Sequence, residues 1–149
     1  LRPLKLLTLD WDLLAFFAGL FVITEALVTT GISEAFFEAG QGVLTNGVPG
    51  LTLITAALSN GISNVPAVLL LQTAVAELGN PQQAWLTLAM ASTLAGNLTL
   101  LGSAATLIVA ELAQHQGVRL SFVEYLRAGV PITIITLLIG VGWLMLTTG

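Results

Sequence analysis

The chain has 149 residues, of which 56% are hydrophobic and 8% are charged, and its mean hydropathy is +0.96. Soluble domains carry about 25% charged residues, so this composition predicts a membrane protein with much of its surface facing lipid. Eight acidic and four basic side chains give a net charge of −4, which excludes a nucleic-acid-binding surface. The sequence contains no cysteine, which excludes disulfides and thiolate metal sites.

The first predicted element is a transmembrane helix over residues 11–30, which begins beside Trp11 and Asp12. An acidic side chain stabilises a helix N-terminus, and tryptophan suits the membrane interface. Residues 32–48 carry too many charges to span a bilayer. They predict an interfacial amphipathic helix that runs into a loop at 42–50.

Residues 51–79 consist of two apolar arms separated by the polar stretch Ser59–Pro66. At ~1.5 Å per residue, neither arm of about 8–13 residues crosses a hydrocarbon core of about 30 Å. Gly61 and Pro66 disfavour a continuous helix through the centre. Two interpretations remain open at this point: a single kinked span, or a re-entrant hairpin whose polar tip reaches the bilayer midplane.

Residues 83–112 form a long apolar stretch that is interrupted at 96–103 by polar residues and glycine. An unbroken helix of this length would be about 45 Å long, which is more than one span needs. Irregular backbone survives at membrane depth only where it lines a cavity or binds a ligand. The stretch therefore predicts two half-helices around an unwound middle, an arrangement with which secondary transporters build substrate and ion sites.

Residues 115–127 predict a polar loop with an interfacial end, and residues 130–147 predict the last transmembrane helix, with Pro131 in its first turn. Lysine and arginine concentrate on cytoplasmic loops. The basic residues are Arg2, Lys5, Arg119 and Arg127. All four lie on one side of the membrane if 51–79 is a re-entrant hairpin, whereas a full crossing divides them two and two. This distribution favours a multi-pass protein of the cytoplasmic membrane with a cytoplasmic N-terminus and an outside C-terminus.

The chain resembles the ion transporter superfamily, and most closely its citrate-transporter-like and arsenite-permease-like anion permeases. The resemblance rests on three segments: 10–22, Ser63–Ala67 and Gly96–Ala105. In that family each of two inverted repeats contributes a hairpin with a Ser-Asn tip and a broken helix. The resemblance implies that this chain is the C-terminal repeat alone, with the N-terminal half of the same transporter as a partner and a homodimer as the assembly. It also places the hairpin entrance outside.

The candidate site lies at the hairpin tip and the break, where hydroxyl, amide and backbone oxygens suit a desolvated cation. The candidate substrate- and ion-binding residues are Ser63, Asn64, Asn97, Thr99, Gly102, Ser103 and Thr106. The resemblance implies Na⁺ as the coupling ion, held by Ser63, Asn64 and Gly102. The half-helix that begins near Ser103 directs a positive N-terminus at the midplane, which suits an anion. Capping of the hairpin helices is the alternative role for the tip residues.

Two departures from the family pattern stand inside these segments. Thr106 occupies a position where relatives often have Asn, and Val65 a position where divalent-anion symporters often have Thr. Val65 offers no hydroxyl for recognising a dicarboxylate. Thr106 keeps an oxygen but lacks an amide.

Three further residues are secondary candidates for the site. Ser59 and Asn60 repeat the tip pair four residues earlier and suit a capping role. Glu25 is the only acid well inside the first span, but it lies roughly 22 Å along the helix from Trp11, near the far interface. Glu111 and His115 read as a solvated face, because two such groups are too few for a metal site.

The sequence predicts an all-α membrane domain with two continuous spans, one broken span and one re-entrant hairpin. The predicted function is secondary active transport of a small inorganic or carboxylate anion, coupled to Na⁺ or H⁺. Sodium/proton antiport and arsenite efflux are alternatives within transport. A non-transporting interaction subunit that pairs with a complementary half is an alternative of another class. No nucleophile–base pair or phosphate-binding loop is present, so neither an enzyme nor a resident cofactor is expected.

Overall fold

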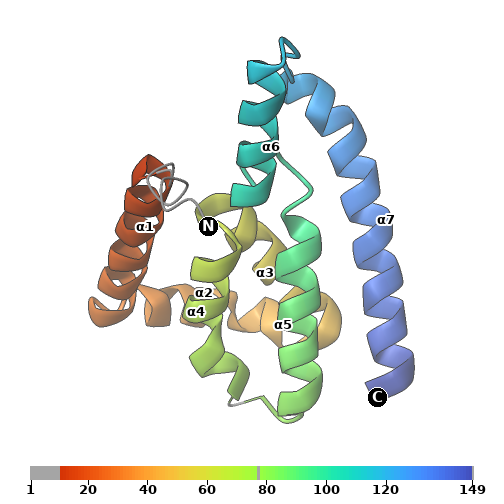
Figure 1. The fold of residues 1–149 in the computed structure, drawn as a ribbon. Helices are drawn as coiled ribbons and strands as arrows, with labels where there is room; N and C mark the ends of the chain where they lie inside the picture. Colours follow the sequence, from red (N-terminus) through yellow and green to blue (C-terminus); the bar gives the residue numbers. More distant parts are fainter. Residues whose placement is uncertain (1–10, 77, 149) are drawn as a thin grey trace, which may run out of the picture.

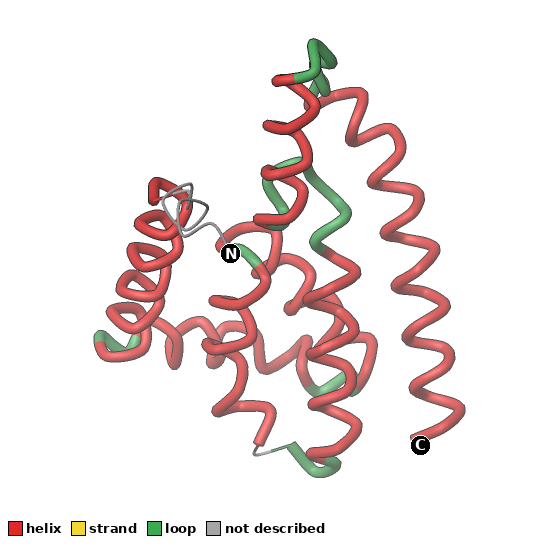
Figure 2. Tube along the Cα trace, in the orientation of Figure 1, coloured by secondary structure: helices red, strands yellow, loops and turns green. Residues whose placement is uncertain are grey.

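The computed structural model describes residues 11–76 and 78–148, and its helices follow one another with short connections (Figure 1). The helices are α1 (Trp11–Thr29), α2 (Ile32–Leu44), α3 (Val48–Ile62), α4 (Asn64–Ala76), α5 (Pro81–Ala95), α6 (Ala104–His115) and α7 (Phe122–Thr148). Regular structure in the described ranges is entirely helical (Figure 2), which confirms the predicted all-α fold.

Helices α3 and α4 form an antiparallel hairpin that turns at a single residue, Ser63. The polar stretch Ser59–Pro66 predicts a longer irregular tip, but α3 continues to Ile62 and α4 already begins at Asn64. Asn60 stays helical while its side chain donates to the carbonyl oxygen of Ala56 at 3.0 Å. Pro66 falls in the first turn of α4, where the missing N–H has no helical partner to lose. The arms are 15 and 13 residues long, or about 22 and 20 Å.

The base of the hairpin brings two turns to the same end of the molecule. Thr45 and Gly47 of the α2–α3 turn line one pocket together with Gly79 and Asn80 of the α4–α5 turn. The expected loop over residues 42–50 is much shorter than predicted, because α2 continues to Leu44 and α3 already begins at Val48. Gly47 makes this tight turn possible with φ +65°, a conformation that disfavours other residues.

Helix α5 is the central element of the fold. It packs against α3, α4 and α7, while α1 contacts α2 and α4 (Figure 1). The apolar core lies at the hairpin base, where these helices meet; its fully buried members are Leu51, Leu71, Val75, Ala84 and Leu88. The apolar contacts therefore fix one end of the hairpin and leave its tip to polar contacts.

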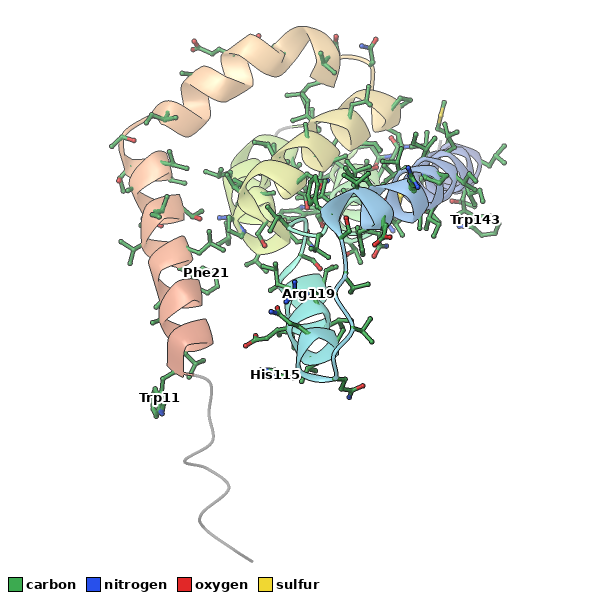
Figure 3. The ribbon with its side chains drawn as sticks, turned by 90° about the horizontal axis from the view of Figure 1, so that it is seen from above. Trp11, Phe21, His115, Arg119 and Trp143 are labelled. Carbon is green, nitrogen blue, oxygen red and sulfur yellow. The ribbon has the colours of Figure 1, made fainter. Side chains whose placement is uncertain are left out.

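Helix α7 is continuous over 27 residues. The sequence analysis placed Pro131 in the first turn of a helix at 130–147, but the structure places it well inside the helix, since α7 begins at Phe122. Of the described helices, α7 is the one long and apolar enough to cross a bilayer by length and composition. Trp143 projects away from the body of the molecule (Figure 3) and is 67% exposed. Helix α7 therefore packs against α5 and α3 with one face and leaves many of its apolar side chains exposed.

Candidate functional site

The hairpin tip packs into the interruption between α5 and α6. Helix α5 ends at Ala95 and α6 begins at Ala104, so residues 96–103 are non-helical, the interval where the sequence analysis expected the break. Figure 1 shows the upper end of α3, the start of α4 and this connection close together, at mid-height between the α4–α5 turn and the α6–α7 loop. The C-terminal ends of α3 and α5 and the N-terminal ends of α4 and α6 therefore converge on one region.

Asn64 fastens the start of α4 to both sides of the break. Its Nδ2 lies 3.0 Å from the carbonyl oxygen of Gly102, 3.1 Å from that of Ser92 and 2.5 Å from the hydroxyl of Ser59. This amide orientation is assigned because the opposite one would direct Oδ1 at two carbonyl oxygens. Ser59 then accepts from Asn64 and donates to the Ser92 carbonyl at 3.0 Å. In this orientation Oδ1 of Asn64 lies on the side of the amide away from Ser59, Ser92 and Gly102.

Asn60 forms a second connection one helical turn before the tip. Its Nδ2 donates to the carbonyl oxygen of Ala95 at 2.9 Å, and its Oδ1 accepts from the hydroxyl of Thr99 at 3.2 Å. Ala95 is the last residue of α5, and its carbonyl also accepts from the backbone N–H of Leu98 at 2.9 Å. Asn60 thus gives this carbonyl a second donor and ties the break to the hairpin.

Two glycines make this close approach possible. A Cβ at Gly102 would lie 2.8 Å from Oδ1 of Asn60 and 2.9 Å from the carbonyl oxygen of Gly96. A Cβ at Gly96 would lie 3.0 and 3.2 Å from the amide atoms of Asn64. Both glycines therefore allow close contacts that a larger side chain would prevent.

Ser63 carries the strained backbone of the site. Its φ is +81° and its ψ is 160°, and within the described ranges it is the one non-glycine residue with positive φ. This conformation belongs almost exclusively to glycine and costs of order 1–3 kcal/mol, and such strain clusters at functional sites. The Ser63 side chain forms no hydrogen bond with any other described residue.

The remaining predicted residues have different surroundings. Ser103 caps α6, where its Oγ accepts from the backbone N–H of Thr106 at 3.2 Å and lies 2.6 Å from the Thr106 hydroxyl. Asn97 is exposed at the start of the break. Glu25 lies apart from this cluster, in a groove that it lines with Leu69 and Gln72 of α4. The structure thus gathers the tip and break residues but not Glu25.

Sequence reasoning ranked Ser59 and Asn60 below the tip pair and missed Ser92 altogether. Ser59 is fully buried and Ser92 is 4% exposed, and each contacts the Asn64 amide or its partners. Ser92 lies four residues before Gly96, one helical turn from the break, and a polar residue at that spacing was the available signal.

The site is rich in oxygen and free of formal charge. The contacts at the tip and break come from serine, threonine and asparagine side chains and from backbone carbonyls. Hard cations prefer such oxygen ligands, and the two helix C-termini add negative partial charge. The two helix N-termini at the same place favour a negative group. Within the described ranges no cluster of acidic, histidine or cysteine side chains could hold a transition metal.

An apolar, all-helical chain whose hairpin tip packs against a broken helix has the architecture of a membrane transporter segment. Residues 6–95 match the family described as citrate transporter, and the chain belongs to that family. The protein is therefore a membrane protein of a transporter family, and the prediction that it is not an enzyme is confirmed by relatives that are named as transporters.

The chain is similar along most of its length to several transporters. It is 40% identical over 146 residues to the transporter named arsB of Dictyostelium discoideum, covering 90% of this chain and 25% of that protein. It is 39% identical over 145 residues to the silicon efflux transporter LSI3 of Oryza sativa subsp. japonica, covering 89% of this chain and 30% of that protein. An uncharacterized transporter of Mycobacterium tuberculosis is 34% identical over 93% of this chain and 35% of its own length.

The chain spans about a quarter to a third of the length of these relatives. No solved structure matches it. The resemblance to the ion transporter superfamily stated from the motifs is confirmed by the family match and by these relatives.

Proposed function

We propose that the full-length protein carries out secondary active transport of a small inorganic or carboxylate anion, coupled to Na⁺ or H⁺. The observation that carries this proposal is the convergence of four helix ends at the hairpin tip, held together by Asn60 and Asn64. Secondary transporters place substrate and coupling ions at such discontinuities, where unwound carbonyls and helix ends replace hydration.

In this proposal the coupling cation binds at Ser63, Asn64 and Gly102. Nδ2 of Asn64 faces its three protein partners, so Oδ1 lies on the other side of the amide, and the Ser63 hydroxyl forms no hydrogen bond with another described residue. The anion binds toward the starts of α4 and α6, with Asn97, Thr99, Ser103 and Thr106 around it. The N–H groups of those helix starts supply positive partial charge.

The membrane arrangement of the proposal follows from the helix lengths. Neither arm of the hairpin reaches across a hydrocarbon core of about 30 Å, and both ends of the hairpin lie at one pocket. The hairpin is then re-entrant from the outside, α1, α5–α6 and α7 cross the cytoplasmic membrane, and α2 lies at its surface. The N-terminal half of the transporter supplies the rest of the site, and the whole protein forms a homodimer.

Efflux of a metalloid oxyacid is a second candidate. One relative is named as a silicon efflux transporter and another is named arsB, and both are about 40% identical to this chain. An uncharged site made of hydroxyl and amide groups also suits a neutral polyhydroxy acid, which needs hydrogen bonds rather than a countercharge.

The experiment uses the full-length protein in proteoliposomes with imposed Na⁺ and proton gradients. Uptake and efflux of sulfate, citrate, succinate, arsenite and silicic acid are recorded for wild type, Asn64→Ala and Asn97→Ala. Gradient-driven anion flux that both substitutions abolish supports the proposal. Gradient-driven arsenite or silicic acid movement alone favours the second candidate, and proton movement without either favours sodium/proton antiport. If no flux of any kind is detected, the remaining hypothesis is a non-transporting interaction subunit.

Asn46→Ala is the matched control, because Asn46 is an exposed asparagine in the α2–α3 turn, away from the break. The same chemical change there should leave transport at the wild-type level. A loss of flux in Asn46→Ala as well would mean that the assay reports folding rather than the site.

A further inference from the structure

Helix α7 also touches the break, and Gly129 is a point of contact. A Cβ at this position would lie 2.5 Å from the carbonyl oxygen of Asn97 and 2.9 Å from that of Leu98. Distances below 3.0 Å are essentially never observed for real Cβ atoms, so something would have to move. The atoms in the way are backbone atoms of the break, which cannot rotate aside as a flexible side chain does.

A second glycine on α7 shows the difference. A Cβ at Gly140 would meet the side chain of Met90 on α5, which has three rotatable bonds and can adopt another rotamer. Gly129 is buried against the carbonyl oxygens of Asn97 and Leu98, and this backbone is itself held by hydrogen bonds. The N–H of Leu98 donates to the Ala95 carbonyl at 2.9 Å, and that same carbonyl accepts from Asn60. The break is thus held between the hairpin and α7.

Pro131 stands two residues beyond Gly129 in the same helix. A proline inside a helix cannot donate to the carbonyl four residues earlier, here that of Arg127, and its ring pushes that carbonyl away. Helices bend where this happens, and Figure 1 shows the first part of α7 inclined to the rest of the helix. The inclined part is the part that carries Gly129 to the break.

We propose that Gly129 is a positioning residue of the transport site and that α7 forms a third wall of that site. The α7 backbone fixes the peptide groups that follow Asn97 and Leu98. Their orientation determines where the exposed Asn97 side chain and the Thr99 hydroxyl are directed. The affinity of the site therefore depends on a residue that touches no ligand. This inference rests on the proposed transport function for its kinetic consequence, but its geometric part stands without it.

The kinetic experiment compares Gly129→Ala with Gly142→Ala in the full-length protein. Gly142 is the matched control: it lies in the same helix, and a Cβ there would meet nothing within 4 Å. Gly129→Ala is expected to raise the KM for the transported ion about tenfold, equivalent to roughly 1.4 kcal/mol of binding, and to keep Vmax within about twofold. Gly142→Ala is expected to match wild type. Equal KM values for the two variants would overturn the proposal.

A second measurement requires no transport. These 149 residues contain no cysteine, so Asn97→Cys introduces a single thiol at the break once any cysteines elsewhere in the full-length protein are removed. Its rate of reaction with a maleimide is compared in the wild-type, Gly129→Ala and Gly142→Ala backgrounds. A rate that changes severalfold in Gly129→Ala alone supports the positioning role even if no substrate is found. An unchanged rate overturns it, whatever the transport assay gives.

Pro131→Ala covers the case in which Gly129→Ala fails to fold. It adds no atom at the contact but allows α7 to straighten, which should withdraw Gly129 from the break. The expected result is the same change in the labelling rate of Asn97→Cys, with helix α7 intact. If a folded Pro131→Ala variant is labelled at the wild-type rate, the proposal that contact with α7 positions the break is contradicted.

Discussion

Asn60 and Asn64 have the same role on two sides of the hairpin tip, because each amide donates to a backbone carbonyl beside the break. Asn60 donates to the carbonyl of Ala95, and Asn64 donates to those of Ser92 and Gly102. In the proposed membrane arrangement no water can replace these bonds, so the two side chains would stabilise an interrupted helix at membrane depth. The side chains that hold the break are distinct from the Ser63 hydroxyl, which forms no hydrogen bond with another described residue.

Removing the Asn60 amide should destabilise the fold. Asn60→Ala removes one of the two donors to the carbonyl of Ala95 and leaves the hydroxyl of Thr99 without its acceptor, at a cost of about 1–3 kcal/mol. The expected result is a lower midpoint of thermal unfolding in detergent, together with reduced transport. Asn46→Ala, in the exposed α2–α3 turn, should leave the midpoint near that of wild type. An Asn60→Ala midpoint equal to that control would mean the two hydrogen bonds carry no net stability.

The backbone and the hydroxyl of Ser63 can be separated by two substitutions. Ser63→Gly accepts φ +81° without a Cβ penalty and should raise the free energy of unfolding by about 1 kcal/mol. Ser63→Ala keeps the strain and removes the hydroxyl, so it should weaken cation-dependent uptake without stabilising the protein. The measurements are thermal unfolding and the Na⁺ dependence of uptake. A Ser63→Gly protein less stable than wild type would show that the strain is absent.

The pattern Ser63-Asn64 indicated the tip from sequence alone, since polar residues in an apolar stretch are conspicuous. Ser59 and Asn60 were ranked lower because a pair one turn earlier on a helix also suits capping. Their real partners, Ser92 and Ala95, lie more than 30 positions away, and no local pattern encodes such pairings. Gly129 was missed for the same reason, since a single glycine in an apolar helix carries no sign of what approaches it.

At the scale of elements, the hairpin is stabilised differently at its two ends. The base is closed by the apolar cluster of Leu51, Leu71, Val75, Ala84 and Leu88. The tip is closed by hydrogen bonds. Apolar runs and helix-breaking residues in the sequence predict that the helices exist, but they do not predict where the helices end. Helix α3 continues through Gly61, and α7 continues through Pro131. Gly61 and Pro131 are both exposed, so the helices continue through them because of the packing of the residues around them, which overrides local propensity.

The base cluster predicts where the hairpin is most sensitive to truncation. Leu71 is fully buried between α4 and its neighbours, so Leu71→Ala should cost about 2–5 kcal/mol and lower the unfolding midpoint strongly. Leu146→Ala is the matched control, because Leu146 is 86% exposed at the end of α7. The midpoints of both variants are measured in the same detergent. Similar midpoints would place the hairpin base outside the stabilising core.

At the scale of the whole molecule, the connections divide between two ends. The α2–α3 turn and the α4–α5 turn share a pocket, and the end of α7 joins them. Asn80 and Gln83 reach Thr148 there, at 3.3 and 2.9 Å. The α6–α7 loop lies at the opposite end of α7 (Figure 1). Arg119 and Arg127 belong to that opposite end, which their positive charge predicts to be the cytoplasmic one.

This division predicts the sidedness of three single-cysteine variants of the full-length protein, with any other cysteines removed. Asn46→Cys and Gly79→Cys stand in the two turns at the hairpin base, and Gln116→Cys stands in the α6–α7 loop; all three positions are exposed. A membrane-impermeant maleimide added outside intact cells should label the first two, and Gln116→Cys should react only after permeabilisation. The physical reason is that two arms of about 22 and 20 Å return the chain to the side from which it entered. Labelling of Asn46→Cys and Gly79→Cys from opposite sides would require residues 48–76 to cross the membrane. It would divide the basic residues between both faces and replace the re-entrant hairpin with a kinked span.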